Sequence, residues 1–129
     1  MLPLEGKVSL VTGAARGIGR AIAMGLAEAG SDIALNFVSN RQAAEETRDA
    51  IRALGRRCEV YQANVAHDDE NHAMGDRISA DFDLVQIIVN NAGITRDRSF
   101  GKMTRAEWDE VLAVNLTGPA LITSLFLPR

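Results

Sequence analysis

A glycine-rich stretch near the start of the chain has the residue types and spacing that suit a phosphate group. It reads Thr-Gly-Ala-Ala-Arg-Gly-Ile-Gly over residues 12–19 and separates an apolar run from a helical pattern. A helix that begins there presents unpaired backbone N–H groups and the positive end of its dipole, which attract phosphate oxygens. Gly13 permits a tight turn, Gly17 a close approach of the backbone to a pyrophosphate, and Gly19 close packing of the helix on a sheet. The residues expected to contact a dinucleotide here are Gly13, Ala15, Arg16, Gly17, Ile18 and Gly19.

The glycine spacing distinguishes this stretch from two common phosphate-binding motifs. No Gly-Lys-Ser/Thr follows the stretch, so it lacks the P-loop pattern, and its spacing also departs from Gly-x-Gly-x-x-Gly. A glycine-rich turn that binds no ligand is the alternative interpretation.

The residues after the second apolar run favour NADP(H) over NAD(H). An NAD-specific site places Asp or Glu at the end of the second strand, where the carboxylate bonds the ribose 2′-hydroxyl. Here no carboxylate occurs after residue 32 until Glu45. A 2′-phosphate instead needs cations and hydrogen-bond donors, which Arg16 and Ser39 offer, as do the neighbouring Asn40 and Arg41. For Arg41, a solvated position at a helix start is the alternative.

Asn115 and Pro119 form the second constellation with chemical potential. Asn115 shares a helical stripe with Trp108, Val111 and Leu112, so we expect its amide to face inward, where it needs a hydrogen-bond partner. Pro119 has no N–H to bond the carbonyl of Asn115, which frees that oxygen, kinks the helix and creates a site for an ordered water. A proline kink beside an incidental asparagine is the alternative.

The elements that must position these residues alternate along the chain. Apolar runs at residues 7–12, 32–37, 58–63 and 84–89 predict strands, the third at a sheet edge. Helical patterns cover residues 17–29, 41–54 and 67–82, and a last helix runs from an N-cap at Thr104, with Glu107 completing a capping box, toward residue 127. The helix at 17–29 carries Ile18, Ile22, Leu26 and Ala29 on one face. This alternation predicts an α/β fold: a doubly wound, Rossmann-like parallel sheet in strand order 3-2-1-4.

Size and composition set the remaining limits. The 129 residues suit one domain, and we expect residues 1–129 to be a single incomplete one, because an apolar fourth strand at the edge calls for a further strand. The net charge of −3 offers no surface for nucleic acid or a membrane. His67 and His72 are not at metal-ligand spacing, so no metal site is expected. One cysteine, no signal peptide and no long apolar run favour a cytoplasmic location.

Two motifs together resemble the short-chain dehydrogenase/reductase family. They are Thr-Gly-x-x-x-Gly-x-Gly at residues 12–19 and Asn-Asn-Ala-Gly at residues 90–93, and the resemblance covers essentially all 129 residues, as the N-terminal half of a member. It implies that Asn64 and Val65 contact adenine, although many members have Asp in place of Asn64, and Gln86 also replaces a common Asp. It further implies that Asn91, Ala92 and Gly93 back the ribose and that Asn115 is the active-site Asn of a proton relay. A basic residue in the glycine loop is typical of the family's NADP users.

Local patterns point to an activity within that family. Residues 90–97, 102–105 and 108–109 resemble 3-oxoacyl-ACP and acetoacetyl-CoA reductases of fatty acid biosynthesis, which implies an oxidoreductase that reduces a 3-oxoacyl thioester of ACP or CoA with NADPH. The family's catalytic Ser and Tyr-x-x-x-Lys lie beyond this point; the one tyrosine, Tyr61, has Val65 four residues later. We therefore expect the chain alone to be inactive. We also expect it to form homo-oligomers. The alternative is an inactive nucleotide-binding or interaction fragment.

Overall fold

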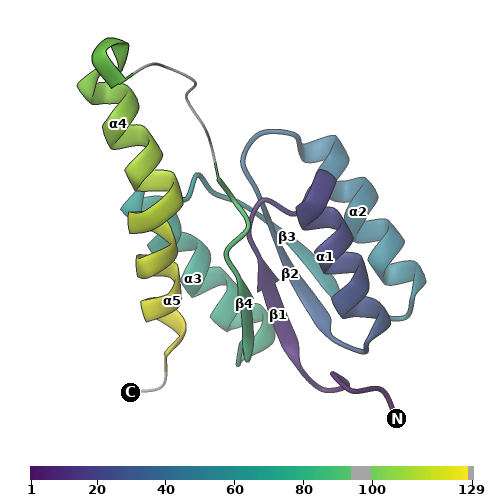
Figure 1. The fold of residues 1–129 in the computed structure, drawn as a ribbon. Helices are drawn as coiled ribbons and strands as arrows, with labels where there is room; N and C mark the ends of the chain where they lie inside the picture. Colours follow the sequence, from purple (N-terminus) through teal and green to yellow (C-terminus); the bar gives the residue numbers. More distant parts are fainter. Residues whose placement is uncertain (94–99, 128–129) are drawn as a thin grey trace.

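The sheet has the predicted topology. The computed structural model describes residues 1–93 and 100–127. Strands β1 (Val8–Val11), β2 (Asp32–Phe37), β3 (Cys58–Gln62) and β4 (Ile87–Val89) form one parallel sheet in the order β3-β2-β1-β4 (Figure 1). The prediction of a doubly wound sheet with the third strand at an edge is confirmed.

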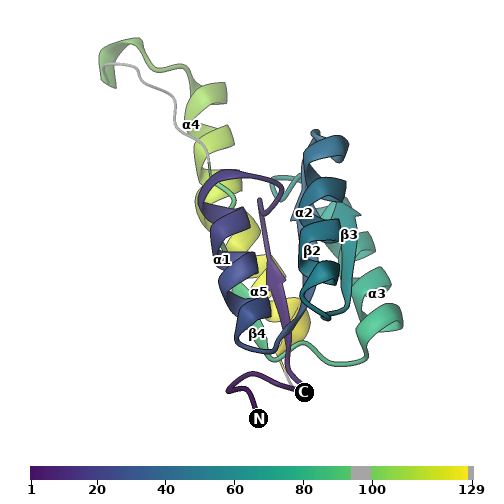
Figure 2. The ribbon, with the colours of Figure 1, turned by 90° about the vertical axis from the view of Figure 1, so that its right-hand side faces the viewer.

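Helices cover both faces of the sheet. Helices α1 (Gly17–Glu28) and α2 (Arg41–Ala53) lie on one face, and α3 (Asp68–Phe82) and α5 (Gly118–Phe126) on the other (Figures 1 and 2). Side chains of a strand alternate between these faces. Ile33 and Leu35 therefore pack with α1 and α2, whereas Ala34 packs with α3 and α5. None of the helices in the described ranges is long and apolar enough to cross a bilayer.

The face of α1 that packs on the sheet differs from the apolar stripe expected from the sequence. Its buried residues are the small Gly19, Ala23 and Ala27, while Ile18 is 75% exposed. The reason is close approach: an added Cβ at Gly19 would lie 2.2 Å from the carbonyl oxygen of Gly13. At the start of α1, close approach of the glycine loop, rather than side-chain size, therefore sets which residue is buried.

Strand β4 begins later than the apolar run suggested. Residues 84–86 precede it, and Leu84 is 68% exposed, because Asp83 ends α3 with a φ of 71°. Gln86 still joins the sheet margin: its backbone N–H donates to the carbonyl of Val8 (3.1 Å), and its side-chain oxygen accepts from the N–H of Val8 (2.8 Å). An amide can thus tie the start of β4 to β1.

The last helix is interrupted by a π-helical turn. The Thr104–Glu107 capping box is confirmed and starts α4 (Arg105–Leu112) after a short 3₁₀ turn, η1 (Phe100–Lys102). A π-helical segment, η2 (Ala113–Thr117), then leads into α5, and the N–H of Gly118 reaches back to the carbonyl of Ala113. Because Pro119 has no N–H to continue the regular ladder, the wider turn takes the place of the expected kink.

This turn also changes which residues face inward. The expectation that Asn115 is buried in a stripe with Trp108 is wrong, because Asn115 is exposed and Trp108 is 47% exposed. The buried positions are Val114, Gly118 and Ile122. The π-helical turn shifts the helical phase, and α4 extends past the end of the sheet, where it has no buried residue (Figure 1).

Candidate functional site

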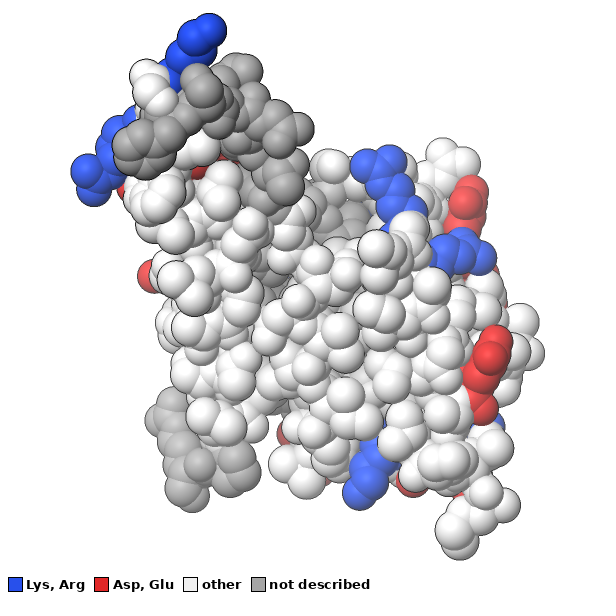
Figure 3. All heavy atoms as spheres, viewed as in Figure 1, with Lys and Arg blue, Asp and Glu red and all other residues white. Residues whose placement is uncertain are grey.

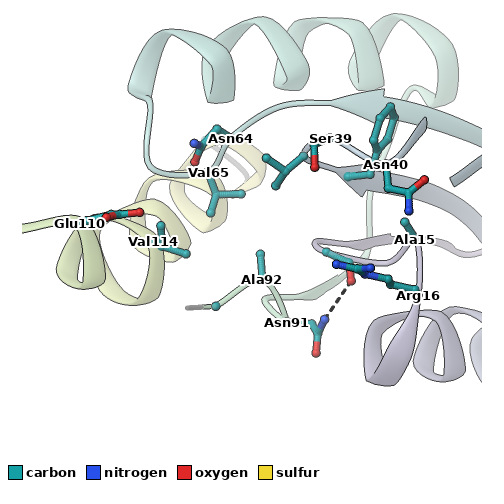
Figure 4. Close-up of a pocket in the computed structure, with 14 residues that line it drawn as sticks. Ala15, Arg16, Ser39, Asn40, Asn64, Val65, Asn91, Ala92, Glu110 and Val114 are labelled. Carbon is teal, nitrogen blue, oxygen red and sulfur yellow. Dashed lines mark hydrogen bonds between the residues drawn. The ribbon is translucent and has the colours of Figure 1, made fainter. Parts of the chain in front are cut away.

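A cavity of about 420 Å³ opens at the carboxyl ends of the strands. Figure 3 shows this face hollowed between the end of the molecule that carries α4 and the α1–α2 side. The loops after the four strands contribute to the cavity, together with α4 and η2. Open parallel sheets bind ligands at this carboxyl edge. Its lining consists of Gly13, Ala15, Arg16, Phe37, Val38, Ser39, Asn40, Asn64, Val65, Asn91, Ala92, Gly93, Glu110 and Val114 (Figure 4).

The glycine loop between β1 and α1 forms the floor of one end of the cavity. Gly13 and Gly17 both have a φ of +62°, a conformation that other residues rarely adopt. An added Cβ at Gly13 would lie 3.1 Å from the Cα of Ala92, so the loop also approaches the segment after β4 closely. Helix α1 has no side-chain cap on its N-terminus and no acidic residue in its first turn. Its first N–H groups therefore remain suited to an anion.

A fully buried amide supports the loop from beneath. The side-chain oxygen of Asn36, on β2, accepts from the N–H of Gly13 (3.1 Å). Its Nδ2 donates to the carbonyls of Tyr61 (3.2 Å) and Ala63 (3.1 Å), and Asn36 is 0% exposed. One side chain thus links the ends of β1, β2 and β3. From α2, the hydroxyl of Thr47 adds a bond to the carbonyl of Ala15 (2.7 Å).

The segment after β4 is fastened to the end of β1. The hydroxyl of Thr12 accepts from the N–H groups of Asn91 and Ala92, each at 3.0 Å. In return, Nδ2 of Asn91 donates to the carbonyl of Gly13 (3.1 Å), the bond drawn in Figure 4. Residues 12–13 and 91–92 therefore form one hydrogen-bonded unit that joins the two motifs.

The segment after β3 forms the opposite wall. Oδ1 of Asn64 accepts from the N–H of Ala66 (2.9 Å), and the N–H of Asn64 donates to Glu70 (3.0 Å). His67 contacts the other carboxylate oxygen of Glu70. The bond from Asn64, and then His67, hold the pKa of Glu70 below its ordinary value. The Asn64–Val65 segment is therefore held rigidly at the start of α3.

The polar groups proposed for a 2′-phosphate are only partly brought together. Arg16 and Ser39 line the cavity, and so does Asn40, whose Oδ1 caps α2 by accepting from the N–H of Ala43 (3.0 Å). Arg41 is not in the lining: its guanidinium lies over the Phe37 ring, 5.0 Å from the centroid, and donates to Gln62 (3.3 Å). The solvated helix-start alternative therefore fits Arg41 better.

Most predicted contact residues line the cavity, and four do not. Gly17, Ile18 and Gly19 lie outside the lining, at the start of α1. Asn115 also lies outside it, but its Oδ1 is 3.2 Å from where a Cβ on Gly93 would be. Residues 94–97 of the 90–97 pattern and residues 128–129 fall outside the described residues.

Sequence reasoning missed the contribution of the last helix. Glu110 and Val114 line the cavity at the end opposite Arg16 (Figure 4). Their spacing of four residues was the available signal, because it places both on one helical face. Val38 and the edge of Phe37 were missed as well; they follow from the position of β2 at the centre of the sheet.

Other reactive side chains are engaged elsewhere. The Tyr61 hydroxyl donates to Asp81 (2.6 Å), and burial followed by this bond raises the pKa of Tyr61 above its ordinary value. Burial raises the pKa of the Cys58 thiol to about 12. Ser124, on α5, donates to the carbonyl of Leu121 (2.7 Å). Across the described ranges, no group of His, Cys, Asp and Glu side chains could hold a metal ion.

The residues that line the cavity suit a dinucleotide-binding site better than a metal site or a site for nucleophilic catalysis. An added Cβ at Gly13 would press on Ala92 and one at Gly19 on the carbonyl of Gly13, so these glycines hold the loop in the shape that leaves its N–H groups open to a pyrophosphate. The helix N-terminus and Arg16 supply positive charge there, whereas Val65 and Val114 offer apolar walls for a base.

Comparison with known proteins places these features in one family. The family model described as short chain dehydrogenase matches residues 7–129. Among curated relatives, a 3-oxoacyl-[acyl-carrier-protein] reductase of Staphylococcus aureus is 46% identical over 112 residues, covering 87% of this chain and 46% of that protein. The same-named protein of Aquifex aeolicus is 42% identical over 122 residues, covering 95% of this chain and 49% of that protein. The chain thus spans about half the length of these relatives.

Solved structures of short-chain dehydrogenases also match this chain. A short chain dehydrogenase from Burkholderia cenocepacia in complex with NADP matches with a TM-score of 0.91 and 38% identity, over 95% of this chain and 50% of that one. A metagenomic short-chain oxidoreductase in complex with NADP matches with a TM-score of 0.89 and 34% identity, over 95% of this chain and 56% of that one.

Proposed function

This chain belongs to the short chain dehydrogenase family, and from that premise we propose that it forms the nucleotide-binding part of an NADP(H)-dependent oxidoreductase. The observation that carries the proposal is the cavity at the carboxyl edge of the sheet, where the glycine loop and the Asn91–Gly93 segment are joined through Thr12 and Asn91. When bound, the nicotinamide would supply a hydride. The chain's own residues bind and orient the cofactor.

Arg16 and Ser39 support NADP(H) over NAD(H). Both line the cavity, and no Asp or Glu belongs to the lining at the end of β2. A guanidinium forms charge-assisted hydrogen bonds with a phosphate, which are roughly twice as strong as neutral ones. The two solved relatives in complex with NADP are consistent with this preference.

The substrate proposal rests on the curated relatives. Several are named 3-oxoacyl-[acyl-carrier-protein] reductase at 42–46% identity. We therefore assign the whole protein the reduction of a 3-oxoacyl thioester of ACP or CoA to the 3-hydroxyacyl form. The part of such an enzyme described here holds the cofactor.

Asn115 is the one residue proposed to take part in proton transfer. Its side chain lies against Gly93, beside the cavity, and it sits in the π-helical turn, a kind of irregular turn that is frequent at functional sites. Tyr61 and Ser124 are bonded away from the cavity. For the 129-residue chain alone we accordingly propose that it binds the cofactor but does not turn over substrate. The alternative of an inactive nucleotide-binding fragment predicts the same lack of activity.

Titration of the purified chain with NADPH and NADH, followed by calorimetry, tests the cofactor proposal. We expect saturable NADPH binding that is tighter than NADH binding by about tenfold or more, as a charge-assisted phosphate contact predicts. Equal affinities would contradict the NADP preference, and no saturable binding by folded chain would contradict the site. Acetoacetyl-CoA added to the NADPH complex separates binding from turnover: oxidation of NADPH would overturn the proposal that this chain only binds.

Self-association is a further part of the proposal. Strand β4 pairs only with β1 among the described strands, so its outer edge is available to a second copy. Sedimentation over a range of concentrations tests this expectation, and a monomer at all concentrations would contradict it.

A further inference from the structure

Thr47 is a polar residue on the buried face of α2, where it lies between Ala44 and Ile51. Its exposed fraction is 0%. A buried hydroxyl costs free energy unless it forms hydrogen bonds, and valine would fill the same space without that cost. The Thr47 hydroxyl donates to the carbonyl of Ala15 (2.7 Å) and accepts from Nη1 of Arg20 (3.2 Å). One side chain of α2 thus joins the glycine loop and α1.

The bond to Ala15 acts on the part of the glycine loop that carries Arg16. The carbonyl of Ala15 and the N–H of Arg16 belong to one planar peptide group, so a bond that fixes the carbonyl also fixes the backbone at Arg16. Arg16 is the N-cap of α1, with an extended backbone, and its side chain is exposed, so its direction depends on that backbone. Asn36 holds the two preceding residues of the loop through bonds of 3.1 and 2.9 Å. The bond from Thr47 is the next support along the loop.

Helix α2 also determines where the other candidate phosphate ligands lie. Asn40 is its N-cap, and Ser39 comes directly before it. Thr47 is about two helical turns further along the same helix. Ser39, Asn40 and Arg16 all line the same end of the cavity (Figure 4). Because the bond from Thr47 to Ala15 joins α2 to the loop residue before Arg16, it holds the two sets of polar side chains at one spacing.

We propose that Thr47 is a positioning residue for NADP(H) selectivity, which acts by keeping Arg16 at a distance from the start of α2 that one phosphate group can bridge. This inference rests on the proposed cofactor function and adds the residue that aligns the site for the 2′-phosphate. NADH lacks that phosphate, so its binding depends on the N–H groups at the start of α1 and not on this spacing. Loss of the Thr47 hydroxyl should therefore affect the two cofactors unequally.

Calorimetric titration of the purified chain with NADPH and NADH tests this role through the ratio of the two affinities. In Thr47→Val, which keeps the side-chain shape but lacks the hydroxyl, we expect the preference for NADPH to fall about fivefold, with NADH binding nearly unchanged. Thr47→Ser keeps a hydroxyl and should stay within about twofold of the wild-type ratio. Thr47→Ala also lacks the hydroxyl and should match Thr47→Val, so it provides the same measurement if the valine variant does not fold.

Ser31→Ala is the matched control for the loss of a buried hydroxyl. Ser31 is 0% exposed and directly precedes β2, at the end of the sheet away from the cavity, where its hydroxyl is bonded to that of Ser9 (2.7 Å). We expect Ser31→Ala to lower stability toward urea, as Thr47→Val does, but to keep the wild-type ratio of affinities. A loss of stability alone would therefore leave the ratio unchanged.

The contrary outcomes are distinct. A wild-type ratio in Thr47→Val and Thr47→Ala, including an equal loss of affinity for both cofactors, would make Thr47 a structural residue only and overturn this inference while leaving the NADP preference intact. A ratio lowered as much in Ser31→Ala would overturn it as well. A wild-type chain that bound both cofactors equally, or neither, would instead contradict the proposed cofactor function, and the role of Thr47 with it.

Discussion

The side chain of Asn36 and the backbone of Gly13 are joined by a hydrogen bond of 3.1 Å beneath the glycine loop. Asn36 comes from the central strand β2, so the position of the loop depends on a residue 23 positions away that never reaches the cavity surface.

Replacing Asn36 with Leu should destabilise the fold and weaken NADPH binding together. The change removes the bond from Gly13 and the bonds of Nδ2, including a weak one to the sulfur of Met74, and it leaves the carbonyls of Tyr61 and Ala63 without this donor. We expect a loss of about 3 kcal/mol or more in the free energy of unfolding, measured in urea. Gln42→Leu, on the exposed side of α2, serves as the control and should change stability by less than about 0.5 kcal/mol. A near-neutral Asn36→Leu would refute the supporting role.

Gly19→Ala and Gly25→Ala test close packing on the same helix. A Cβ at Gly19 would meet the carbonyl oxygen of Gly13 at 2.2 Å and Nδ2 of Asn91 at 2.6 Å, so the loop must move. At Gly25 nothing lies within 4 Å. We expect Gly19→Ala to abolish NADPH binding, whereas Gly25→Ala should bind normally and gain about 0.5–1 kcal/mol of stability from helix propensity. Calorimetry and thermal unfolding decide, and normal binding by Gly19→Ala would contradict the geometry.

Arg16→Ala should lower the affinity for NADPH by about tenfold or more and leave that for NADH nearly unchanged, because only NADPH carries the 2′-phosphate. Arg41→Ala removes a cation that lies over Phe37 instead of in the cavity, so it should have a smaller effect. Calorimetric titration of both variants with NADPH and NADH measures the ratio of the two affinities for each variant. If Arg41→Ala had the larger effect, the assignment of the phosphate contact would move to α2.

Gly118→Ala should separate the last helix from the segment after β3. Its Cβ would lie 2.3 Å from the carbonyl oxygen of Val65, and backbone cannot yield as a flexible side chain does. We expect a loss of about 2 kcal/mol or more in stability and weaker binding of adenine nucleotides. Gly101→Ala, with nothing within 4 Å, is the matched control. Unchanged denaturation of Gly118→Ala would rule out this contact.

The buried thiol predicts a pH effect. Burial raises the pKa of Cys58 from its ordinary value of 9.0 to about 12. Below pH 9 the thiol is neutral in both the folded and unfolded chain, and between pH 9 and 12 only the unfolded chain ionises, so stability falls across that interval. Alkylation at pH 9 should be slow in buffer and fast in denaturant. Cys58→Ala should show a smaller decline in stability above pH 9 than the wild type does, and equal declines would contradict the burial effect.

Local patterns predicted the sheet and most of the cavity. The strand order, the capping box at Thr104 and the loop at residues 12–19 all depend on short segments with specific residue types, so they were accessible from sequence. Asn91 was predicted from the resemblance of residues 90–93 to a family motif, and in the structure its amide donates to the carbonyl of Gly13.

The features that were not predicted depend on contacts between segments that lie far apart in the sequence. The buried face of α1 could not be predicted from hydrophobicity, because the glycine loop and Asn91 approach Gly19 too closely for a side chain. Glu110 and Val114 were missed because the predicted inward stripe was placed on Trp108 and Asn115, and the π-helical turn at residues 113–117 buries Val114 instead. The support given by Asn36 links three strands, and no single segment encodes it.

The π-helical turn makes this part of the chain depend on its length as much as on its composition. Deleting one residue from positions 115–117 would allow an ordinary α-helical repeat with little change in helical phase, because a π-helical turn takes up about one more residue than an α-helical turn does. Forcing the present residues into an unbroken α-helix would instead rotate α4 about the helix axis relative to α5 and shift Glu110 and Val114 relative to the cavity. The π-helical turn therefore holds in phase the part of the helix that packs on α3 and the part that lines the cavity.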